Sequence, residues 1–438
     1  MTDIEFGGLL FGICLVLIAL RMSVAIAMFV VGGIGFAILA GWPAFLGLLN
    51  TSPFGRTSGY TLSVLPLFLL MGQFATRAGL GRSLFDSARA WMGHRRGGLA
   101  ISTVIGCAAF GSICGSSFAT AATMSSVALP EMKRCGYSGA LATGSLAAGG
   151  TLGILIPPSI ILVIYAIITE QSIGKLFFAA LIPGIIAVLG YSIAISIYVK
   201  LKPESAPVVP AAPLRERVRS LRTVWPVAAI FLVVMGGIYL GIFTPTEGAA
   251  IGAASTLLLA CVSRRLNWEG FVSSVLETAR TTGAIFLILI GAEVYNAFLA
   301  LSQIPVEVAS AFANSGLTPM SILIGILLIY LILGCVMDSL AMILLTVPVF
   351  FPLITGLDFG LTEEEIAIWF GILTLIVVEV GLITPPIGLN VYVISSIAGS
   401  IPLSDSFKGI FPFLLSDLVR IAIIVIAPAT CIWLPSLL

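Results

Sequence analysis

Residues 153–158, Gly-Ile-Leu-Ile-Pro-Pro, and residues 381–386, Gly-Leu-Ile-Thr-Pro-Pro, repeat one signature inside two long apolar segments. They hold the only Pro-Pro pairs of the chain. Proline lacks an amide hydrogen and displaces the carbonyl four residues back, so each pair breaks a helix and frees backbone oxygens at membrane depth. One pair alone is compatible with a structural kink. Two matched pairs indicate an internal repeat and the ion site of a secondary transporter.

The composition excludes a soluble domain. The chain has 438 residues, of which 59% are hydrophobic and 9% are charged. Apolar stretches of 18 or more residues recur along nearly its whole length, which is typical of a polytopic membrane protein. The seven cysteines include no CxxC motif and lie mostly in apolar segments, so we interpret them as apolar fillers and not as disulfides or metal ligands.

About ten apolar segments are long enough to cross a bilayer. They lie at 4–20, 22–40, 60–76, 138–168, 174–199, 224–242, 246–262, 282–303, 365–397 and 409–436. Two further stretches, 98–130 and 317–352, are too long for one crossing and contain a Gly/Ser/Asp break, which predicts re-entrant hairpins. Five crossings per half invert the second half relative to the first. The predicted fold is an all-α polytopic membrane protein with inverted-topology repeats.

The predicted organisation has three parts. Residues 1–200 form the first repeat, with hairpin 98–130 and broken helix 138–168. Residues 201–223 are Pro-rich and basic and form a cytoplasmic linker, whose charge we interpret as a topology signal and not as a nucleic-acid patch. Residues 224–438 form the second repeat, with hairpin 317–352 and broken helix 365–397. The polar stretch 266–281 has helical apolar spacing, which predicts a surface helix at the inner interface.

The distribution of basic residues predicts the orientation. With the N-terminus outside, 18 of the 21 Lys and Arg residues fall in cytoplasmic loops, while the acidic stretch 358–365 falls outside. The positive-inside rule therefore favours a bacterial inner-membrane protein with both termini in the periplasm.

The break of the first hairpin is rich in small and hydroxylated residues. Glycines allow close approach of backbone carbonyls, and serine hydroxyls are neutral oxygen ligands that suit a hard monovalent cation. The same residue types also serve tight helix packing in lipid, so both interpretations are open. In the second hairpin the corresponding stretch is Gly334-Cys-Val-Met-Asp338-Ser339, in which a carboxylate replaces a hydroxyl.

Five acidic residues lie within or at the edge of apolar segments: Glu247, Glu293, Asp338, Glu379 and Asp417. A bare charge in hydrocarbon is costly, so each needs a partner, a proton, water or an ion. We predict that Asp417 pairs with Arg420 one turn away, that Glu247 caps a helix, and that Asp338 binds a cation. Glu293 is open between a site and a protein interface. Glu379 is open between a neighbour of the ion site and a structural hydrogen-bond partner.

No enzyme motif is present. The chain has one histidine, His94, in a basic loop, and lacks HExxH, a Walker loop and a GxGxxG after a strand. We predict no catalytic residue and no enzyme activity. A hydrolase built on Ser116 or Ser117 is a minor alternative, and a scaffold subunit without an ion site is another.

Six motifs together resemble the large membrane subunit of tripartite ATP-independent periplasmic (TRAP) transporters, over essentially the whole chain in order. They are Gly-Ser-Ile-Cys-Gly-Ser-Ser-Phe-Ala (111–119), Leu-Pro-Glu-Met-Lys-Arg-Cys-Gly-Tyr (129–137), Gly-Thr-Leu-Gly-Ile-Leu-Ile-Pro-Pro-Ser (150–159), Phe-Thr-Pro-Thr-Glu (243–247), Met-Asp-Ser (337–339) and Glu-Val-Gly-Leu-Ile-Thr-Pro-Pro-Ile-Gly-Leu-Asn (379–390).

The resemblance implies a sodium-coupled, elevator-type uptake system for organic acids. It also implies two partners, a small four-helix membrane subunit and a periplasmic substrate-binding protein that delivers the anion. Two sodium sites are expected, each between a hairpin tip and the broken helix of the same half. The first resembles Ser112, Ser116, Ser117, Gly149 and Gly153, with Pro157 shaping the break; the second resembles Gly334, Met337, Asp338, Gly381 and Thr384.

Some expectations stay open at this level. Cys114 stands where the family commonly has serine, which leaves the side-chain role of that position open. The organic acid is not identified; we place its site near Ser116, Ser117 and Asn390, where backbone amides, hydroxyls and helix N-termini would meet a carboxylate. The alternative within transport is a self-sufficient sodium- or proton-coupled carboxylate carrier of a related inverted-repeat fold.

Overall fold

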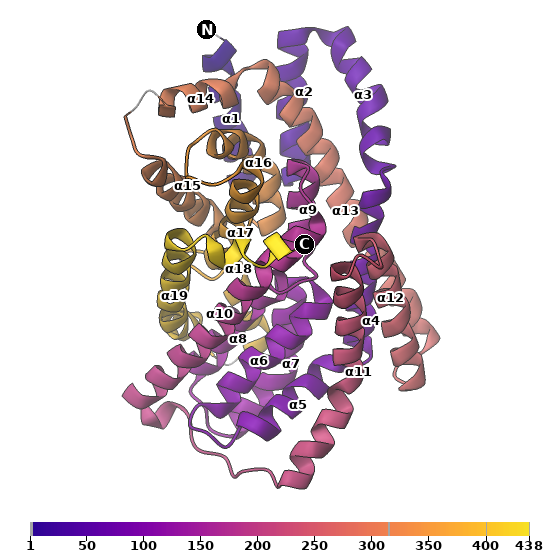
Figure 1. Cartoon of the computed structure of the whole chain (residues 1–438), viewed down its shortest axis with the longest axis vertical. Helices are drawn as coiled ribbons and strands as arrows, with labels where there is room; N and C mark the ends of the chain where they lie inside the picture. The colour runs from indigo at the N-terminus through magenta and orange to yellow at the C-terminus, as the bar shows by residue number, and fades with distance from the viewer. Residues whose placement is uncertain (1–2, 314–315, 400, 438) are drawn as a thin grey trace.

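The computed structural model describes residues 3–313, 316–399 and 401–437, and every regular element within these ranges is a helix (Figure 1). The first half contains α1 (Asp3–Ala19), α2 (Val24–Ala40), α3 (Trp42–Thr57), η1 (Tyr60–Ser63), α4 (Val64–Arg77), α5 (Leu80–Met92), α6 (Gly98–Cys114), α7 (Ser117–Arg134), α8 (Gly139–Leu155), α9 (Ile160–Thr169), α10 (Ile173–Leu201) and η2 (Pro203–Ser205).

The second half repeats much of this order. It contains α11 (Leu214–Tyr239), α12 (Pro245–Val262), α13 (Trp268–Leu301), α14 (Ile304–Ala313), α15 (Pro319–Gly334), α16 (Ser339–Thr355), α17 (Glu363–Gly381), α18 (Leu389–Ala398), α19 (Leu403–Ile426), α20 (Ala429–Ile432) and η3 (Pro435–Leu437).

Many of these helices are suited to a lipid environment. Five of the described helices, α10, α11, α12, α13 and α19, are long and apolar enough to cross a membrane, and two bent pairs, Tyr60–Arg77 with Leu80–Met92 and Gly139–Leu155 with Ile160–Thr169, meet the same test. Hydrocarbon offers backbone groups no hydrogen-bond partner, which is why a spanning chain of this composition folds as helices. The prediction of an all-α polytopic membrane protein is confirmed.

Two hairpins occupy the stretches predicted to be re-entrant. In the first, α6 and α7 are joined by Gly115 and Ser116; Gly115 has φ +64°, and the Ser116 side chain caps α7 by accepting from the Ala119 amide at 3.4 Å. In the second, α15 and α16 are joined by 335–338, and Asp338 is the N-cap of α16. A left-handed glycine and a side-chain cap allow a chain to leave one helix and begin another within a few residues.

Each Pro-Pro pair interrupts a helix, as the sequence predicts. The axis bends by 42° between α8 and α9, and Ser159 caps the new helix by accepting from the Leu162 amide at 3.3 Å. In the second half α17 ends at Gly381 and α18 begins at Leu389. Both Pro-Pro bonds are cis.

The two halves are interleaved around these breaks. The final long helix of each half packs on the broken helix of the other: α19 lies on α8, and α10 lies on α17. The second segments behave likewise, since α18 lies on α7 and α8, and α9 lies on α16 and α17. The crossing of α19 with α8 is very close, because a methyl carbon added to Gly144 would lie 2.5 Å from the carbonyl carbon of Gly409. Small residues permit such contact between membrane helices.

A second group of helices packs beside this interleaved body. Here α13 lies on α2 and α4, α12 lies on α4 and α11, and α1 lies on α2. Two helices that precede the hairpins connect the groups: α5 contacts both α6 and α11, and α14 contacts both α16 and α1. Figure 1 shows α2, α3 and α13 side by side along one edge of the molecule, away from α19.

Several details differ from the sequence-based prediction. The predicted crossing 409–436 is divided, because α19 ends at Ile426 and Pro428 precedes the short helix α20. Helix α11 already begins at Leu214, so only 202–213 separates the halves, because residues 214–222 are mostly good helix formers after Pro213. The predicted surface helix 266–281 is the first part of the continuous 34-residue helix α13, since no proline interrupts it. Helices α3 and α14 were not predicted.

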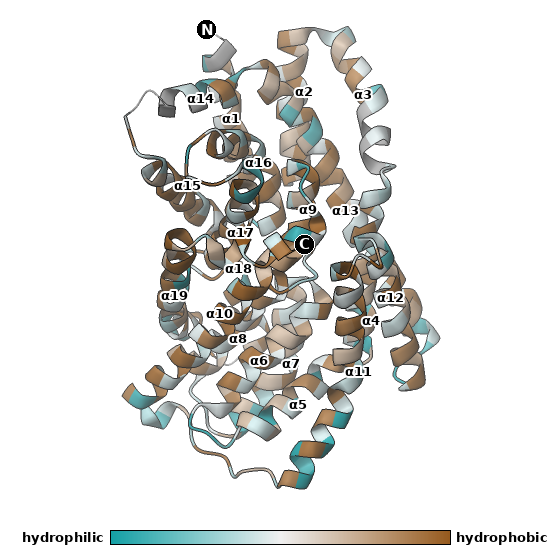
Figure 2. Ribbon diagram, viewed as in Figure 1, coloured by the Kyte–Doolittle hydropathy of each residue, from teal (hydrophilic) through white to brown (hydrophobic). Residues whose placement is uncertain are grey.

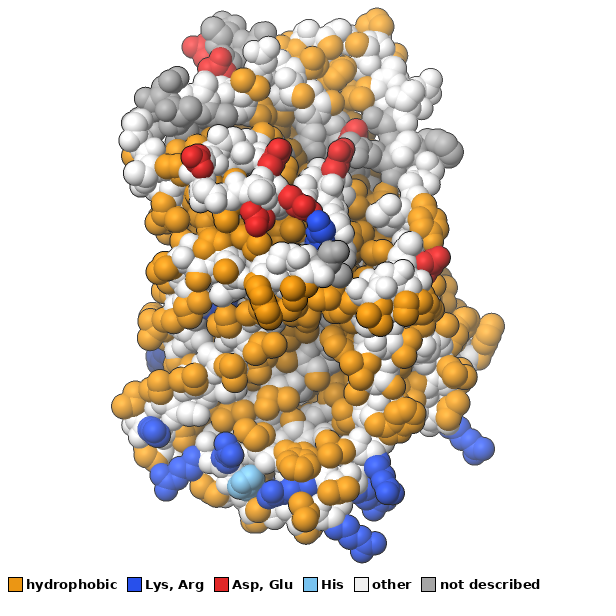
Figure 3. Space-filling model, in the orientation of Figure 1, with side chains coloured by type: hydrophobic (Ala, Val, Ile, Leu, Met, Phe, Trp, Pro, Cys, Tyr) orange, Lys and Arg blue, Asp and Glu red, His pale blue; other side chains and the backbone are white. Residues whose placement is uncertain are grey.

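Charge and hydropathy are strongly polarised along the molecule. Figure 2 shows hydrophobic residues over most of the helical body and hydrophilic ones gathered toward the ends of several helices. Figure 3 shows Lys and Arg side chains concentrated at the lower end in this view, and Asp and Glu side chains in the upper part.

Candidate ion and substrate site

The tip of the first hairpin lies against the break of α8. A methyl carbon added to Gly115 would lie 2.9 Å from the carbonyl oxygen of Pro158, and one added to Gly153 would lie 2.8 Å from that of Ser116. Gly111 also contacts Gly153 through the backbone. Only residues without a Cβ allow this approach. The structure thus brings Ser116, Gly153 and the Pro157 segment together.

Two other predicted residues lie close to this contact and face different partners. The Ser112 hydroxyl donates to the carbonyl of Ala109 in its own helix at 2.8 Å. Gly149 lies one turn before Gly153 and faces α6, where an added methyl carbon would lie 2.8 Å from the Cys107 sulfur. Cys114 is buried, and its carbonyl oxygen would lie 3.0 Å from a methyl carbon on Gly72 of α4.

Several oxygen atoms at the contact between the first hairpin tip and the break of α8 lack a hydrogen-bond donor among the residues that the structure describes. The buried hydroxyls of Ser117 and Thr120 make no hydrogen bond of ordinary geometry among the described residues. Pro157 and Pro158 also deprive the carbonyls of Gly153 and Ile154 of their usual helical donors. Buried polar atoms are nearly always satisfied, so such a set needs an explanation. Hydroxyl and carbonyl oxygens of this kind fit a dehydrated sodium ion.

The tip of the second hairpin meets the break of α17 in the same manner. A methyl carbon added to Gly381 would lie 2.6 Å from the Cα of Gly334. Asp338 is half-buried, and its carboxylate accepts from the Ala341 amide at 3.4 Å. Met337 beside it is buried. A carboxylate at a helix N-terminus is stabilised by the helix dipole and remains able to bind a cation.

Carbonyls at the second break accept hydrogen bonds from nearby residues of the chain. The amide of Thr384 donates to the Gly381 carbonyl at 3.0 Å, and the amide of Asn390 donates to the Leu382 carbonyl at 3.1 Å. The Thr384 hydroxyl donates to the Val380 carbonyl at 2.6 Å. The prediction that each Pro-Pro pair leaves its carbonyls free therefore needs correction here, although each carbonyl oxygen keeps a second lone pair.

Glu379 lies between the two tips. The Ser339 hydroxyl donates to its Oε1 at 2.8 Å, and its Oε2 has no hydrogen-bond partner among the described residues. The Ser117 hydroxyl of the other half lies close enough to interact with this carboxylate. Asn390 is fully buried near the start of α18, and both polar atoms of its amide lack partners within the described ranges.

Asp417 and Arg420 form the predicted ion pair, with 2.7 Å between Oδ1 and Nη2. The sequence did not reveal two more members of this buried cluster. The Tyr191 hydroxyl donates to the Asp417 carboxylate at 2.9 Å and lies 3.2 Å from the Thr151 hydroxyl. Arg420 and Asp417 also act electrostatically on Glu379, so an arginine stands closer to the predicted site than the sequence indicated. One feature of the sequence pointed to Thr151: it stands two residues before Gly153, just as Glu379 stands two residues before Gly381.

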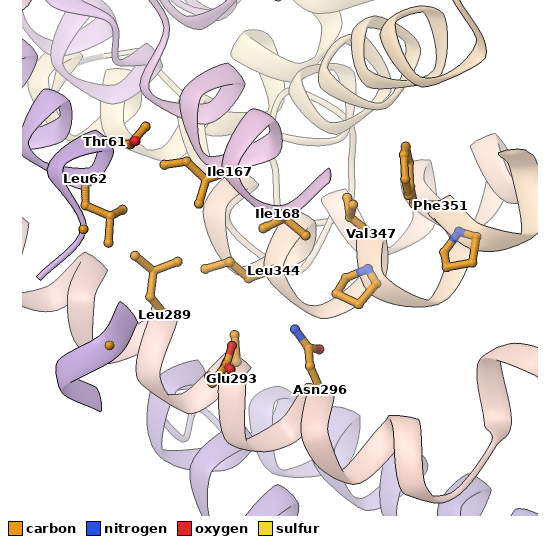
Figure 4. Close-up of a pocket in the computed structure, with 15 residues that line it drawn as sticks. Thr61, Leu62, Ile167, Ile168, Leu289, Glu293, Asn296, Leu344, Val347 and Phe351 are labelled. Atoms are coloured by element: carbon orange, nitrogen blue, oxygen red, sulfur yellow. The ribbon is translucent and has the colours of Figure 1, made fainter. Parts of the chain in front are cut away.

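The remaining two acidic residues lie away from the tips. Glu247 forms a capping box with Thr244, as predicted for a helix cap. Glu293 and Asn296 on α13 line a cavity of about 480 Å³, which Figure 4 shows between α13 and the residues Ile167, Ile168 and Leu344. This cavity lies between the second group of helices and the interleaved body, so Glu293 faces an interface between helix groups.

Comparisons with known proteins show the family to which the chain belongs. Residues 11–430 match the family described as "Tripartite ATP-independent periplasmic transporter, DctM component". The C4-dicarboxylate TRAP transporter large permease protein DctM of Pseudomonas aeruginosa is 38% identical, over 87% of this chain and 88% of that protein. The sialic acid TRAP transporter large permease protein SiaM of Vibrio cholerae is 30% identical, over 92% and 95%.

The fold is shared more widely than the sequence. The crystal structure of the Alcanivorax borkumensis YdaH transporter aligns with a TM-score of 0.61 over 89% of both chains, at 14% identity, which shows a common fold. The matched family model spans nearly the whole chain, and the two relatives cover 87% and 92% of it. The chain therefore belongs to the TRAP transporter family as a large permease (DctM) component, a membrane transport protein whose relatives are permeases and not enzymes.

Proposed function

We propose that this chain carries an organic acid anion across the bacterial inner membrane together with sodium ions, as the large subunit of a binding-protein-dependent TRAP transporter. The observation that carries the proposal is the pair of hairpin tips, each held against a helix break by glycine contacts and surrounded by oxygen atoms. Backbone and hydroxyl oxygens at membrane depth are the ligands a dehydrated cation requires.

The two proposed sodium sites follow these contacts. The first uses Ser112, Ser116, Ser117, Gly149 and Gly153, and the second uses Gly334, Met337, Asp338, Gly381 and Thr384. The orphaned hydroxyl of Ser117 supports the first site, and the carboxylate of Asp338 supports the second. Since Asp338 is the one charged residue among the proposed ligands, a cation at the second site is neutralised there.

The proposed transport cycle is an elevator movement of one body past another. The moving body comprises α6–α10 and α15–α19, which are interleaved, and the fixed body comprises α1–α4 and α11–α13. The connecting helices α5 and α14 each contact both bodies, as an element that guides such a movement must. The cavity beside Glu293 lies on the surface across which the bodies would slide.

The proposed membrane topology has inverted repeats, about ten crossings and two re-entrant hairpins. The gathering of basic side chains at one end of the molecule supports a cytoplasmic position for that end (Figure 3). Both termini are then periplasmic.

Cysteine labelling in a background without native cysteines tests this orientation. Arg217 lies near the start of α11 and Glu364 near the start of α17. A membrane-impermeant thiol reagent added outside the cells should label Glu364→Cys strongly and Arg217→Cys only after permeabilisation. Labelling of Arg217→Cys in intact cells, or protection of Glu364→Cys, contradicts the inverted arrangement.

The proposed partners are a small membrane subunit and a periplasmic substrate-binding protein. The description of the family as tripartite and the names of the relatives as large permease proteins support both. The substrate class is supported by the C4-dicarboxylate and sialic acid named for two relatives. Around Ser116, Ser117 and Asn390, helix N-termini can meet a carboxylate. The alternative, a self-sufficient carrier, predicts uptake into liposomes without any binding protein.

Replacing Asp338 with asparagine tests the second sodium site. Asparagine caps helices as well as aspartate does, so α16 should stay capped while the charge is lost. Sodium at one hundred times its Kd stabilises a one-site protein by about 2.7 kcal/mol. We expect Asp338→Asn to melt like the unaltered protein without sodium and to lose the part of the sodium-dependent rise that the second site contributes.

The matched control is Asp405→Asn on α19, an exposed aspartate that pairs with Lys408 at 3.4 Å. It should keep the full sodium response, with potassium as the ionic-strength control for both variants. An unchanged sodium response in Asp338→Asn would show that this carboxylate serves only as a helix cap.

A further inference from the structure

One carboxylate reaches both hairpin tips. Glu379 stands in the last turn of α17, where Ser339 of the second tip donates to it at 2.8 Å and Ser117 of the first tip lies beside it. The two serines occupy equivalent places, since each directly follows the residue that caps its helix, Ser116 or Asp338. A single side chain thus lies between matching positions of two hairpins that belong to different halves.

Glu379 has no ion-pair partner of its own among the described residues. It is almost completely buried, at 1% exposure. Arg420 forms its ion pair with Asp417, and both groups act on Glu379 with opposite sign. A buried carboxyl group in this position holds hydroxyl donors by hydrogen bonds and, when ionised, attracts cations bound nearby.

Glu379 and Ser117 do not form a full hydrogen bond, so their contact can still tighten. Glu379 Oε2 and Ser117 Oγ both lack a hydrogen bond of ordinary geometry within the described part of the chain, and the serine is fully buried. The contact with Ser339 is complete. A small movement of the first tip would therefore allow Ser117 to donate to Oε2, so that both tips bind one carboxylate.

The described part of the first half has no such link. Thr151 occupies the place that corresponds to Glu379, two residues before the glycine of the motif, and its hydroxyl lies beside the Tyr191 hydroxyl, at 3.2 Å. Tyr191 in turn binds Asp417. Thr151 is thus connected to Tyr191 and Asp417 and not to either tip. Glu379 is the residue that connects the two tips.

We infer that Glu379 is a positioning residue that couples the two hairpin tips, so that a cation bound at one tip increases the affinity of the other. This inference rests on the proposed function, because it requires two cation sites. Binding at the second tip fixes Ser339 and with it the Glu379 side chain. The Ser117 hydroxyl then meets an ordered acceptor, and the first tip loses less conformational freedom when its own cation binds.

Sodium titration of the purified full-length chain measures this coupling. We expect equilibrium binding of radioactive sodium to saturate along a curve whose Hill coefficient approaches 2, the number of coupled sites. Glu379→Met keeps an unbranched side chain but removes the acceptor, and Ser339→Ala removes one donor without changing a proposed sodium ligand. Both variants should still respond to sodium, with a Hill coefficient near 1 and a half-saturating concentration about tenfold higher.

The matched control for Ser339→Ala is Thr346→Val. Thr346 lies on the same helix and is similarly buried, but its hydroxyl donates to the Met342 carbonyl of that helix at 2.6 Å, about two turns from the tip. It should keep the Hill coefficient of the unaltered protein, as should Thr151→Val. Loss of packing alone lowers the melting temperature at all sodium concentrations and leaves the shape of the titration unchanged, so the two causes are separable.

The outcomes distinguish this inference from the proposed function. A Hill coefficient that stays near 2 in Ser339→Ala and Glu379→Met, or one near 1 in the unaltered protein, overturns the coupling role while the sodium sites stand. If Glu379→Met does not fold, Ser339→Ala decides, because Ser339 donates to Glu379 and is not a proposed sodium ligand. No sodium response in the unaltered protein, with potassium as reference, overturns the proposed function and the coupling with it.

Discussion

Arg420→Met is expected to lower the free energy of unfolding by about 3–5 kcal/mol, the cost of leaving one member of a buried ion pair without its partner. Arg420 is 3% exposed and Asp417 is 1% exposed, and their side chains are 2.7 Å apart. Methionine fills a similar volume, so lost packing contributes little. The effect should be measured by thermal and denaturant unfolding of the purified protein in detergent, without sodium.

Two controls identify the cause. Lys408→Met changes a cation on the same helix with the same spacing to its acid, Asp405, but this pair is exposed and should cost no more than about 1 kcal/mol. The double variant Asp417→Leu with Arg420→Met removes both charges and should recover most of the lost stability. A double variant as unstable as Arg420→Met would show that the arginine acts through packing and not by compensating Asp417.

Gly409→Ala should have the second large effect, because a methyl group at this position collides with the backbone of Ala140 in α8. Nearby carbon atoms of Ala140 would lie 2.6 and 3.1 Å from the new methyl group. Backbone atoms cannot turn aside as a flexible side chain can, so α8 and α19 must separate. Overpacking of this kind costs about 1–3 kcal/mol. The melting temperature of the purified protein measures it.

Gly325→Ala is the matched control for this variant. Gly325 lies inside α15, and no atom lies within 4 Å of its added methyl carbon. Alanine favours helix over glycine by about 1 kcal/mol, so this variant should be as stable as the unaltered protein or slightly more so. Equal stability of both variants would mean that α8 and α19 are not in close contact in the membrane.

The helices of this fold are largely predictable because lipid leaves few options. A chain of long apolar segments must satisfy its backbone internally, and the glycines, Ser116, Asp338 and the Pro-Pro pairs mark where helices end. Local sequence said less about α3 and α14, which are short and lie between spanning segments. The length of α13 was also missed, because its polar first part has the same helical pattern as a separate surface helix.

The candidate site was predictable only within each half. The contact of Gly153 with the first tip and of Gly381 with the second connects segments that follow one another in sequence. The approach of Ser117 to Glu379, and of Tyr191 to Asp417, depends on how the halves are interleaved. No periodicity or spacing within one segment contains that information, so one sequence left the role of Glu379 open.

The interleaving of α10 with α17 and of α19 with α8 also bears on how this chain can be divided. Neither half owns a complete core, so a fragment ending near Leu201 would expose the helix faces that its other half covers. The segment 202–213, by contrast, lies between α10 and α11 and carries no spanning helix. A gene interrupted within 202–213 could still yield one transporter from two polypeptides, provided that both are made together. Each polypeptide would then cover the helix faces that the other exposes.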